Sequence, residues 1–270
     1  MDSQLPGDDR LIAYYTEVEN EAERLSAPYN RLEFLRTREL LRSRLPAAPA
    51  RLLDVGGGTG AHAAWLANDG YRVELLDPVP KHVRQATELS ASLEYGFSAR
   101  VGDARNLDVG DDEVDSCLLL GPLYHLPEAD DRAAALAEAV RVTRPGGLVA
   151  AASISRYAWP LYGLRDGESL RETELARTLM DGCYDGEQGF TLAYSHRPGE
   201  LQDEFTDAGL VETEIFGIEG PGWILFARGL TADCAEALIA TSLQVARLYD
   251  GYSDMAGGSA HVLACGRVPT

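Results

Sequence analysis

The sequence predicts an α/β fold, a doubly wound sheet of about seven strands that is mostly parallel and has an antiparallel edge strand. Three observations lead to this prediction. Short apolar runs alternate with helical stretches between residues 51 and 153, a run of glycines closes the first apolar run, and 270 residues suffice to bury a full core. Helical elements at the N-terminus and an inserted lid are expected to complete the fold.

The elements follow in order. Leu32, Leu35 and Leu40 fall near helical spacing within residues 10–45, and the PAAP motif at 46–49 ends that region. The next stretch reads as strand, glycine turn, helix and strand, which is the βαβ unit of a parallel sheet. The strands of this unit are expected at 51–55 and 71–77, and further strands at 97–101, 114–120, 148–153 and 210–216, with 260–267 as a last edge strand. Later helices are expected at 79–91, 128–143, 198–208 and 231–248.

Residues 155–195 break this alternation and are rich in glycine, tyrosine and charge, so we interpret them as an inserted lid. The predicted organisation is an N-terminal helical cap (1–48), a core (49–154), a lid and substrate-recognition segment (155–196), and a C-terminal part of the core with a cap helix (197–270).

Composition limits the partners. The net charge of −19 would repel a polyanion, so nucleic acids are not expected as substrates. The four cysteines are far apart and form no CxxC pair, which argues against a zinc site. No apolar segment approaches the length of a membrane span or a signal sequence. We therefore expect a cytoplasmic monomer or homodimer that acts on a small molecule or short peptide and needs no metal.

The glycine loop is the strongest local signal. Residues 54–60 read DVGGGTG, and glycines at Gly56, Gly58 and Gly60 permit positive φ and close approach of a ligand to the backbone. A tight strand-to-helix turn would need the same residues. Asp77 follows the next strand at the distance expected of a carboxylate that binds ribose hydroxyls, although it could instead cap the following helix.

Three later motifs narrow the choice of ligand. Gly102-Asp103-Ala104 follows the third strand, LLLGPLYHL (118–126) ends the fourth, and RVTRPGGL (141–148) precedes the fifth. Together with the glycine loop, these motifs resemble the class I S-adenosylmethionine (SAM)-dependent methyltransferases, a Rossmann-like superfamily. The resemblance implies SAM as the cofactor, S-adenosylhomocysteine (SAH) as its product, and cofactor contacts from Asp54, Gly56, Gly58, Gly60, Asp77, Asp103, Ala104 and Leu120, with Asp103 on the adenine amino group.

The resemblance extends outward to a bacterial small-molecule subgroup. Tyr14 and Arg24 lie ahead of the sheet, in a stretch similar to that subgroup's N-terminal helix, and by this analogy they would cover the methionine end of SAM. A guanidinium can bind a carboxylate through two hydrogen bonds. A solvated helix face is the alternative position for Arg24.

Methyl transfer from a sulfonium is an in-line displacement on to an O, N or C atom, and it depends mainly on alignment of donor and acceptor. A base helps if the acceptor must lose a proton. His125 beyond the fourth strand and His196 at the start of a helix are the predicted catalytic residues, although either could serve only as a loop or helix contact. The predicted substrate-binding residues are Tyr124, Tyr194 and Trp223, which would be equally ordinary in a core. His261 in the last strand is expected to be structural.

Two other functions share part of this pattern. A NAD(P)- or FAD-dependent oxidoreductase explains the glycine loop and Asp77, but it does not explain the Gly-Asp-Ala motif. A non-catalytic SAM-binding protein would use the same cofactor residues without turnover. The acceptor itself is not specified by the sequence, because one fold hosts many functions.

Overall fold

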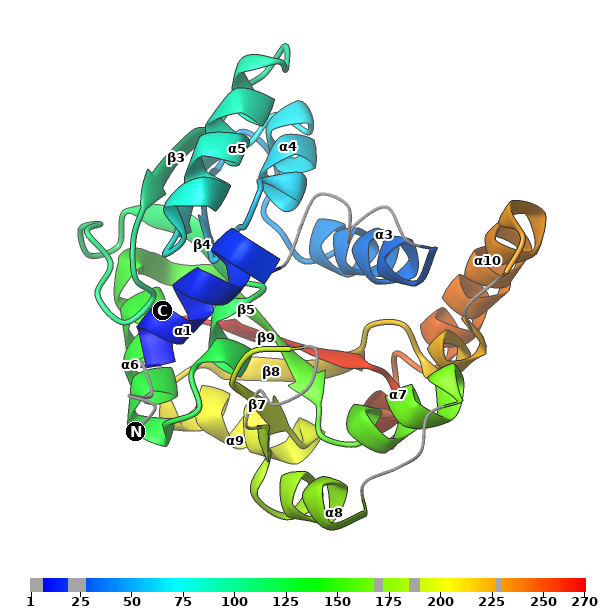
Figure 1. The fold of residues 1–270 in the computed structure, drawn as a ribbon. Coiled ribbons are helices and arrows are strands. Elements are labelled where there is room, and N and C mark those ends of the chain that lie inside the picture. The colour runs from blue at the N-terminus through cyan, green and yellow to red at the C-terminus, as the bar shows by residue number, and fades with distance from the viewer. Residues whose placement is uncertain (1–6, 19–27, 168–171, 185–189, 227–229) are drawn as a thin grey trace.

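A computed structural model describes residues 7–18, 28–167, 172–184, 190–226 and 230–270. In this part of the chain the strands form one nine-stranded sheet flanked by helices (Figure 1). Its central strands run in the order β3-β2-β1-β4-β5 and all four neighbouring pairs are parallel. The predicted fold class is confirmed. These strands are β1 (Arg51–Val55), β2 (Arg72–Asp77), β3 (Ser98–Val101), β4 (Val114–Leu119) and β5 (Thr143–Ser155).

Helices cover both faces of this sheet because its central strands are apolar on both sides. One core cluster joins β1, β4 and β5 to α6 and α9, and a second joins the same strands to α3, α4 and α5. The two clusters give the doubly wound layering that the sequence predicts. The helices are α3 (Pro28–Arg42), α4 (Ala61–Asn68), α5 (Pro80–Ala91), α6 (Ala129–Val142) and α9 (Pro198–Asp207).

The last strand departs from the prediction. β9 (His261–Arg267) pairs antiparallel with β5 on one side and with β8 (Val211–Gly217) on the other. The prediction that residues 260–267 form an edge strand is therefore wrong, and β8 is the antiparallel strand at the edge. Because β9 runs against β5, its first residue lies at the carboxyl end of the parallel strands, where Ile154 pairs with His261.

The inserted segment combines helices with a small hairpin. It contains α7 (Ala158–Asp166), α8 (Glu172–Asp181), β6 (Cys183–Tyr184) and β7 (Ala193–His196). Strand β7 joins the main sheet, because Ser195 and His196 pair with the end of β5. His196 thus ends a strand instead of beginning a helix as predicted, and α9 starts at Pro198.

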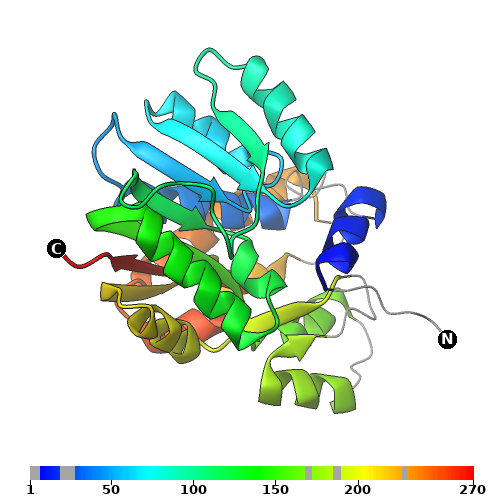
Figure 2. The ribbon, with the colours of Figure 1, turned by 90° about the vertical axis from the view of Figure 1, so that its left-hand side faces the viewer.

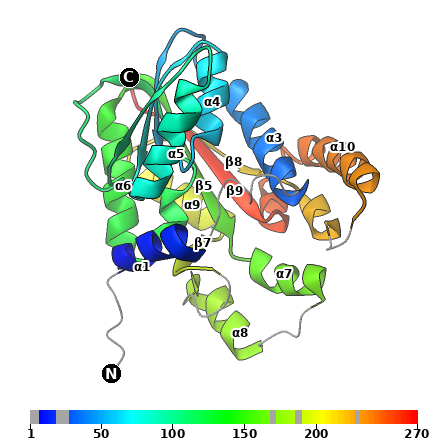
Figure 3. The ribbon, with the colours of Figure 1, turned by 45° about the horizontal axis from the view of Figure 1, so that its top comes forward.

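Further helical elements lie beyond the carboxyl edge of the sheet or beside it. Figure 2 shows α1 (Gly7–Ala13) and α8 beyond the ends toward which the parallel strands point. In Figure 3, α3 lies beside α10 (Ala232–Leu248), with which it is in contact. A π-helical turn at Tyr14–Val18 continues α1, and short 3-10 helices cover Pro122–His125, Pro221–Leu225 and Ser253–Gly258.

Candidate active site

The glycine loop turns sharply from β1 into α4. Gly56 and Gly60 adopt φ angles of +69° and +90°, which side chains rarely tolerate. The space around them is also filled, since a Cβ on Gly56 would lie 2.7 Å from Cδ of Pro122 and one on Gly60 would lie 2.6 Å from Cζ of Phe97. The loop therefore requires glycine for both conformation and packing.

Asp77 holds this loop from the neighbouring strand. Its Oδ2 accepts a hydrogen bond from the backbone N–H of Gly58 at 2.9 Å. Its Oδ1 accepts from the N–H of Val79, also at 2.9 Å, and lies 3.1 Å from Nδ1 of His82. Asp77 also lines the cavity described below. The carboxylate thus makes contacts at the start of α5 and still faces the position expected for a ribose.

Asp54 lies beneath the loop and is fully buried. Within the described part of the chain, neither of its carboxylate oxygens has a hydrogen-bond partner. Burial, together with the negative charge of Asp77, raises the pKa of Asp54 to about 7. An unpaired buried carboxylate is costly in its ionised form, which is why the carboxyl of Asp54 tends to hold its proton.

Asp103 and Ala104 follow β3 and line the same cavity. Asp103 accepts hydrogen bonds from the Arg105 guanidinium, with Nη2 to Oδ2 at 2.6 Å. Partial burial would raise the pKa of Asp103, but the bonds from Arg105 outweigh it and the pKa is lowered. This carboxylate stays ionised and about half exposed, so it can accept further hydrogen bonds.

The cavity lies along the carboxyl edge of the sheet and has a volume of about 1060 Å³. The glycine loop and the ends of β2 and β3 form one wall. His125 lies beside Tyr124 on another, with its Nε2 3.0 Å from the hydroxyl of Tyr15 and its ring stacked on Phe190. Helices α1, α3, α7 and α8 and the first residue of β9 contribute much of the remaining lining.

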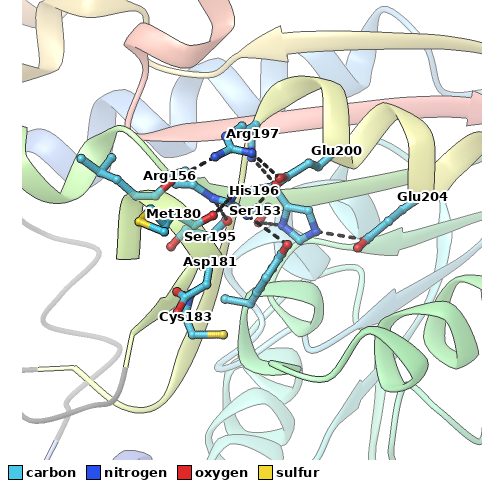
Figure 4. A network of polar contacts seen from close by, with 12 residues as sticks. Ser153, Arg156, Met180, Asp181, Cys183, Ser195, His196, Arg197, Glu200 and Glu204 are labelled. Atoms are coloured by element: carbon cyan, nitrogen blue, oxygen red, sulfur yellow. Dashed lines mark hydrogen bonds and ion pairs between the residues drawn. The ribbon is translucent and has the colours of Figure 1, made fainter. Parts of the chain in front are cut away.

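Several predicted site residues lie elsewhere. His196 is fully buried between Ser153, whose Oγ lies 2.5 Å from Nδ1, and Glu204, 3.0 Å from Nε2 (Figure 4). Burial lowers the pKa of His196, although its hydrogen bond to the Glu204 carboxylate opposes this shift, so the neutral ring is favoured. Tyr194 lies under the Arg132 guanidinium, at 3.7 Å, and accepts a hydrogen bond from Arg156. Neither of these two rings lines the cavity.

Of the remaining predicted residues, some line the cavity and others lie in the core or behind the cavity wall. Trp223 is completely buried in a third core cluster and donates its Nε1–H to Gly258. Leu120 packs against the second core cluster, and Tyr14 contacts Tyr15 and Phe190 edge-on behind the cavity wall. The cavity is lined by Gly56, Gly58, Asp77, Asp103, Ala104, Tyr124 and His125, whereas Asp54, Gly60, Leu120, Tyr14, Tyr194, Trp223 and His196 do not line it, and Arg24 falls outside the described residues.

A second group of polar residues at the cavity was missed by the sequence reasoning. Tyr29 and Glu33 of α3, Tyr162 of α7 and His261 of β9 all line it. The hydroxyls of Tyr29 and Tyr162 lie 2.9 Å apart, and Nδ1 of His261 lies 2.6 Å from Oε1 of the buried Glu219. These residues come from distant parts of the chain and carry no shared motif. The available signal was His261 itself, a polar residue at the start of a strand that was predicted to be antiparallel.

Comparisons with known proteins agree with the geometry. Residues 53–151 match the family model described as a methyltransferase domain. An uncharacterized methyltransferase of Mycobacterium avium is 40% identical over 102 residues, which are 38% of this chain and 38% of that protein. Another, from Mycobacterium bovis, is 35% identical over 136 residues, or 47% of this chain and 52% of that one. The chain thus spans between about a third and a half of these curated relatives.

Solved structures show the same fold over more of the chain. Phosphoethanolamine N-methyltransferase 2 of Haemonchus contortus, in complex with SAM, has a TM-score of 0.62 at 13% identity and covers 99% of this chain and 61% of its own. At this identity the likeness concerns the fold alone. Within the described residues, no helix has the length and apolar character of a membrane span.

Proposed function

We propose that the chain is a class I SAM-dependent methyltransferase that transfers the methyl group of SAM to a small molecule by in-line displacement, and the match of residues 53–151 to a methyltransferase domain supports this proposal. One observation carries this proposal: a single cavity joins the glycine loop and two carboxylates to a second, aromatic and ionisable wall. The first wall offers what an adenosyl group needs, and the second leaves room for an acceptor.

The cofactor is proposed to lie against the glycine loop. Backbone near Gly56 and Gly58 would contact it closely, Asp77 would accept hydrogen bonds from the ribose hydroxyls, and Asp103 would bind the adenine amino group. Both carboxylates face the cavity, which supports these roles. SAM supplies an activated methyl group when bound, so the chain has mainly to align the acceptor and exclude water.

The acceptor is proposed to be a small molecule or short peptide instead of a nucleic acid, reacting through O, N or C. The net charge of −19 opposes a polyanion, and residues of α1, α7 and α8 line the cavity beyond the sheet. We further propose that no metal participates. His125 lines the cavity just beyond β4, where we propose that it contacts either the cofactor or the acceptor.

Calorimetry with SAM and SAH tests the proposal. Asp103→Asn should weaken SAH binding by about ten- to a hundredfold, because it removes a charged acceptor worth about 1.5–3 kcal/mol. Asp131→Asn is the matched control, since Asp131 also pairs with Arg105, at 3.1 Å, but does not line the cavity. Absence of heat with both SAM and SAH, or binding of NADH or FAD in their place, would overturn the proposal.

A further inference from the structure

Resting on that proposed function, we propose that His261 and Glu219 are the proton-accepting pair of this enzyme, and that the acceptor therefore reacts through an O–H or N–H group. His261 lines the cavity, and its side chain is 12% exposed, whereas the Glu219 side chain behind it is completely buried. The arrangement is a base whose ring is fixed from behind by a carboxylate.

Glu219 is built into its position. Its Oε2 accepts hydrogen bonds from the hydroxyl of Ser259 at 2.6 Å and from the backbone N–H of His261 at 3.0 Å. The same Ser259 oxygen accepts from the N–H groups of Glu219 and Gly220. Burial alone would raise the pKa of Glu219, but the charge and hydrogen bonds of its partners outweigh it and lower the pKa. The carboxylate is therefore ionised and cannot rotate freely.

An ionised carboxylate fixes the tautomer of His261. Such a group only accepts hydrogen bonds, so Nδ1, 2.6 Å from Oε1 of Glu219, must carry the proton. In the neutral ring, Nε2 then holds the lone pair and is the basic nitrogen. A neighbouring carboxylate also stabilises the imidazolium once a proton has been accepted.

The surroundings of His261 suit a proton-accepting role. From α3, the Tyr29 ring stacks on the imidazole and Glu33 lies with Oε2 3.9 Å from Nδ1. From α7 come Tyr162 and the Arg165 guanidinium, which covers the tyrosine rings and pairs with Asp166. Burial raises the pKa of both tyrosines, so their hydroxyls stay neutral. Two carboxylates, those of Glu33 and Glu219, thus lie near the ring.

A divalent cation is the competing use of these groups. Single ligand atoms of Glu33, Glu219 and His261 lie within 4.8 Å of one another. However, Nδ1 of His261 is already within hydrogen-bond distance of Oε1 of Glu219, and Oε2 accepts hydrogen bonds from Ser259 and from the backbone N–H of His261. A cation would have to break this set, so the geometry favours proton transfer.

The proposed step combines methyl transfer with loss of the acceptor's proton. A lone pair of the acceptor oxygen or nitrogen forms a bond to the methyl carbon, and the carbon–sulfur bond breaks with its electron pair moving to sulfur. The acceptor proton passes to Nε2 of His261, which gives an imidazolium paired with Glu219. That proton leaves to solvent after the product departs.

The tautomer can be tested in the wild-type chain. Nitrogen-15 spectra of the histidine side chains, with His261 assigned by His261→Gln, should show a proton on Nδ1 and none on Nε2 at pH 8. Glu219→Gln should lower the pKa of His261 by about one unit, a tenfold change in proton affinity, because it removes the facing charge. An Nε2-protonated ring in the wild type would overturn the proposal whatever the variants do.

Chemical labelling supplies a matched comparison. Diethyl pyrocarbonate should modify His261 in the apo chain at least tenfold faster than His196, which forms the same kind of pair with Glu204 inside the core. Glu219→Gln should slow labelling of His261 severalfold, while Glu204→Gln should leave it unchanged. Equal labelling of His261 in wild type and Glu219→Gln would contradict the proposal.

Turnover completes the test. With phenol and benzylamine as probes and SAH release as the readout, His261→Gln should lower kcat at least a hundredfold while SAH affinity by calorimetry is retained. Undiminished kcat in the variant would refute the role of His261. If the wild-type chain did not bind SAH, the methyltransferase proposal itself would be refuted, so the two failures are distinguishable.

Discussion

Replacing Asp54 by asparagine should stabilise the apo protein, and increasingly so as pH rises. Asp54 is fully buried, and in the described part of the chain no donor reaches its oxygens. Burial and the charge of Asp77 raise its pKa from 3.8 to about 7. In the folded state the carboxyl thus holds its proton over a pH range in which the unfolded chain has released it.

The sign and size follow from linkage. The folded state binds more protons than the unfolded state between pH 4 and 7, so stability falls as pH rises through that window. Each pH unit is worth about 1.4 kcal/mol, so ionisation of Asp54 costs up to about 4 kcal/mol above pH 7. The protonated acid and the amide have similar size and similar desolvation. The stabilisation by Asp54→Asn should therefore be below 1 kcal/mol at pH 4 and up to about 4 kcal/mol at pH 8.

Urea unfolding of both proteins at pH 4, 6 and 8 measures this difference. Asp112→Asn is the control, because Asp112 is exposed and asparagine tolerates its φ of 57°. It should change the free energy of unfolding by less than 0.5 kcal/mol at every pH. A stability difference for Asp54→Asn that does not grow with pH would refute the reasoning, and a destabilisation at pH 8 would show that the carboxylate has a stabilising partner.

Three further predictions concern packing, the lid and metal. Gly60→Ala should lower the free energy of unfolding by about 2–3 kcal/mol, because alanine is strained at φ +90° and its Cβ would clash with Phe97. Gly199→Ala in α9 has open space around it and should raise the free energy of unfolding by up to about 1 kcal/mol in the same urea assay. Arg156→Ala should lower the free energy of unfolding by about 3–5 kcal/mol and release the β6–β7 hairpin, because the buried guanidinium donates hydrogen bonds to Glu200, Tyr194 and the carbonyl oxygens of Ser195 and Met180. As a control, Arg197→Ala removes an exposed partner of the same Glu200 and should lower the free energy of unfolding by less than about 1 kcal/mol. Equal melting temperatures of the two variants would contradict this prediction. Dialysis against EDTA should leave SAH affinity unchanged by calorimetry, and a loss of affinity restored by a divalent cation would contradict the metal-free proposal.

Local signals predicted the wall of the cavity that the glycine loop, Asp77 and Asp103 form. The glycine loop, Asp77 and Asp103 each follow a strand of the parallel sheet, and parallel strands deliver their carboxyl ends to one edge. A residue after such a strand can therefore be assigned to the edge without knowledge of the packing. His125 follows from the same rule, because it lies just beyond β4.

The wall opposite the glycine loop could not be found in this way. His196 and His261 both lie next to strand ends, and the sequence suggested the first as catalytic and the second as structural. In the structure, β7 buries His196 between Ser153 and Glu204, while β9 runs antiparallel to β5 and brings His261 to the cavity. Strand direction and neighbours depend on pairing with β5, to which β7 is paired across 41 positions of the chain and β9 across more than a hundred.

The sequence by itself determined the doubly wound sheet, the glycine turn and the carboxylates that follow β2 and β3, because strand periodicity, turn residues and connection order are encoded within short stretches of chain. Only the tertiary structure decided which ionisable residues line the wall of the cavity opposite the glycine loop. The direction of β9 and the buried hydrogen bonds of Glu219 arise from long-range packing, which no local pattern specifies.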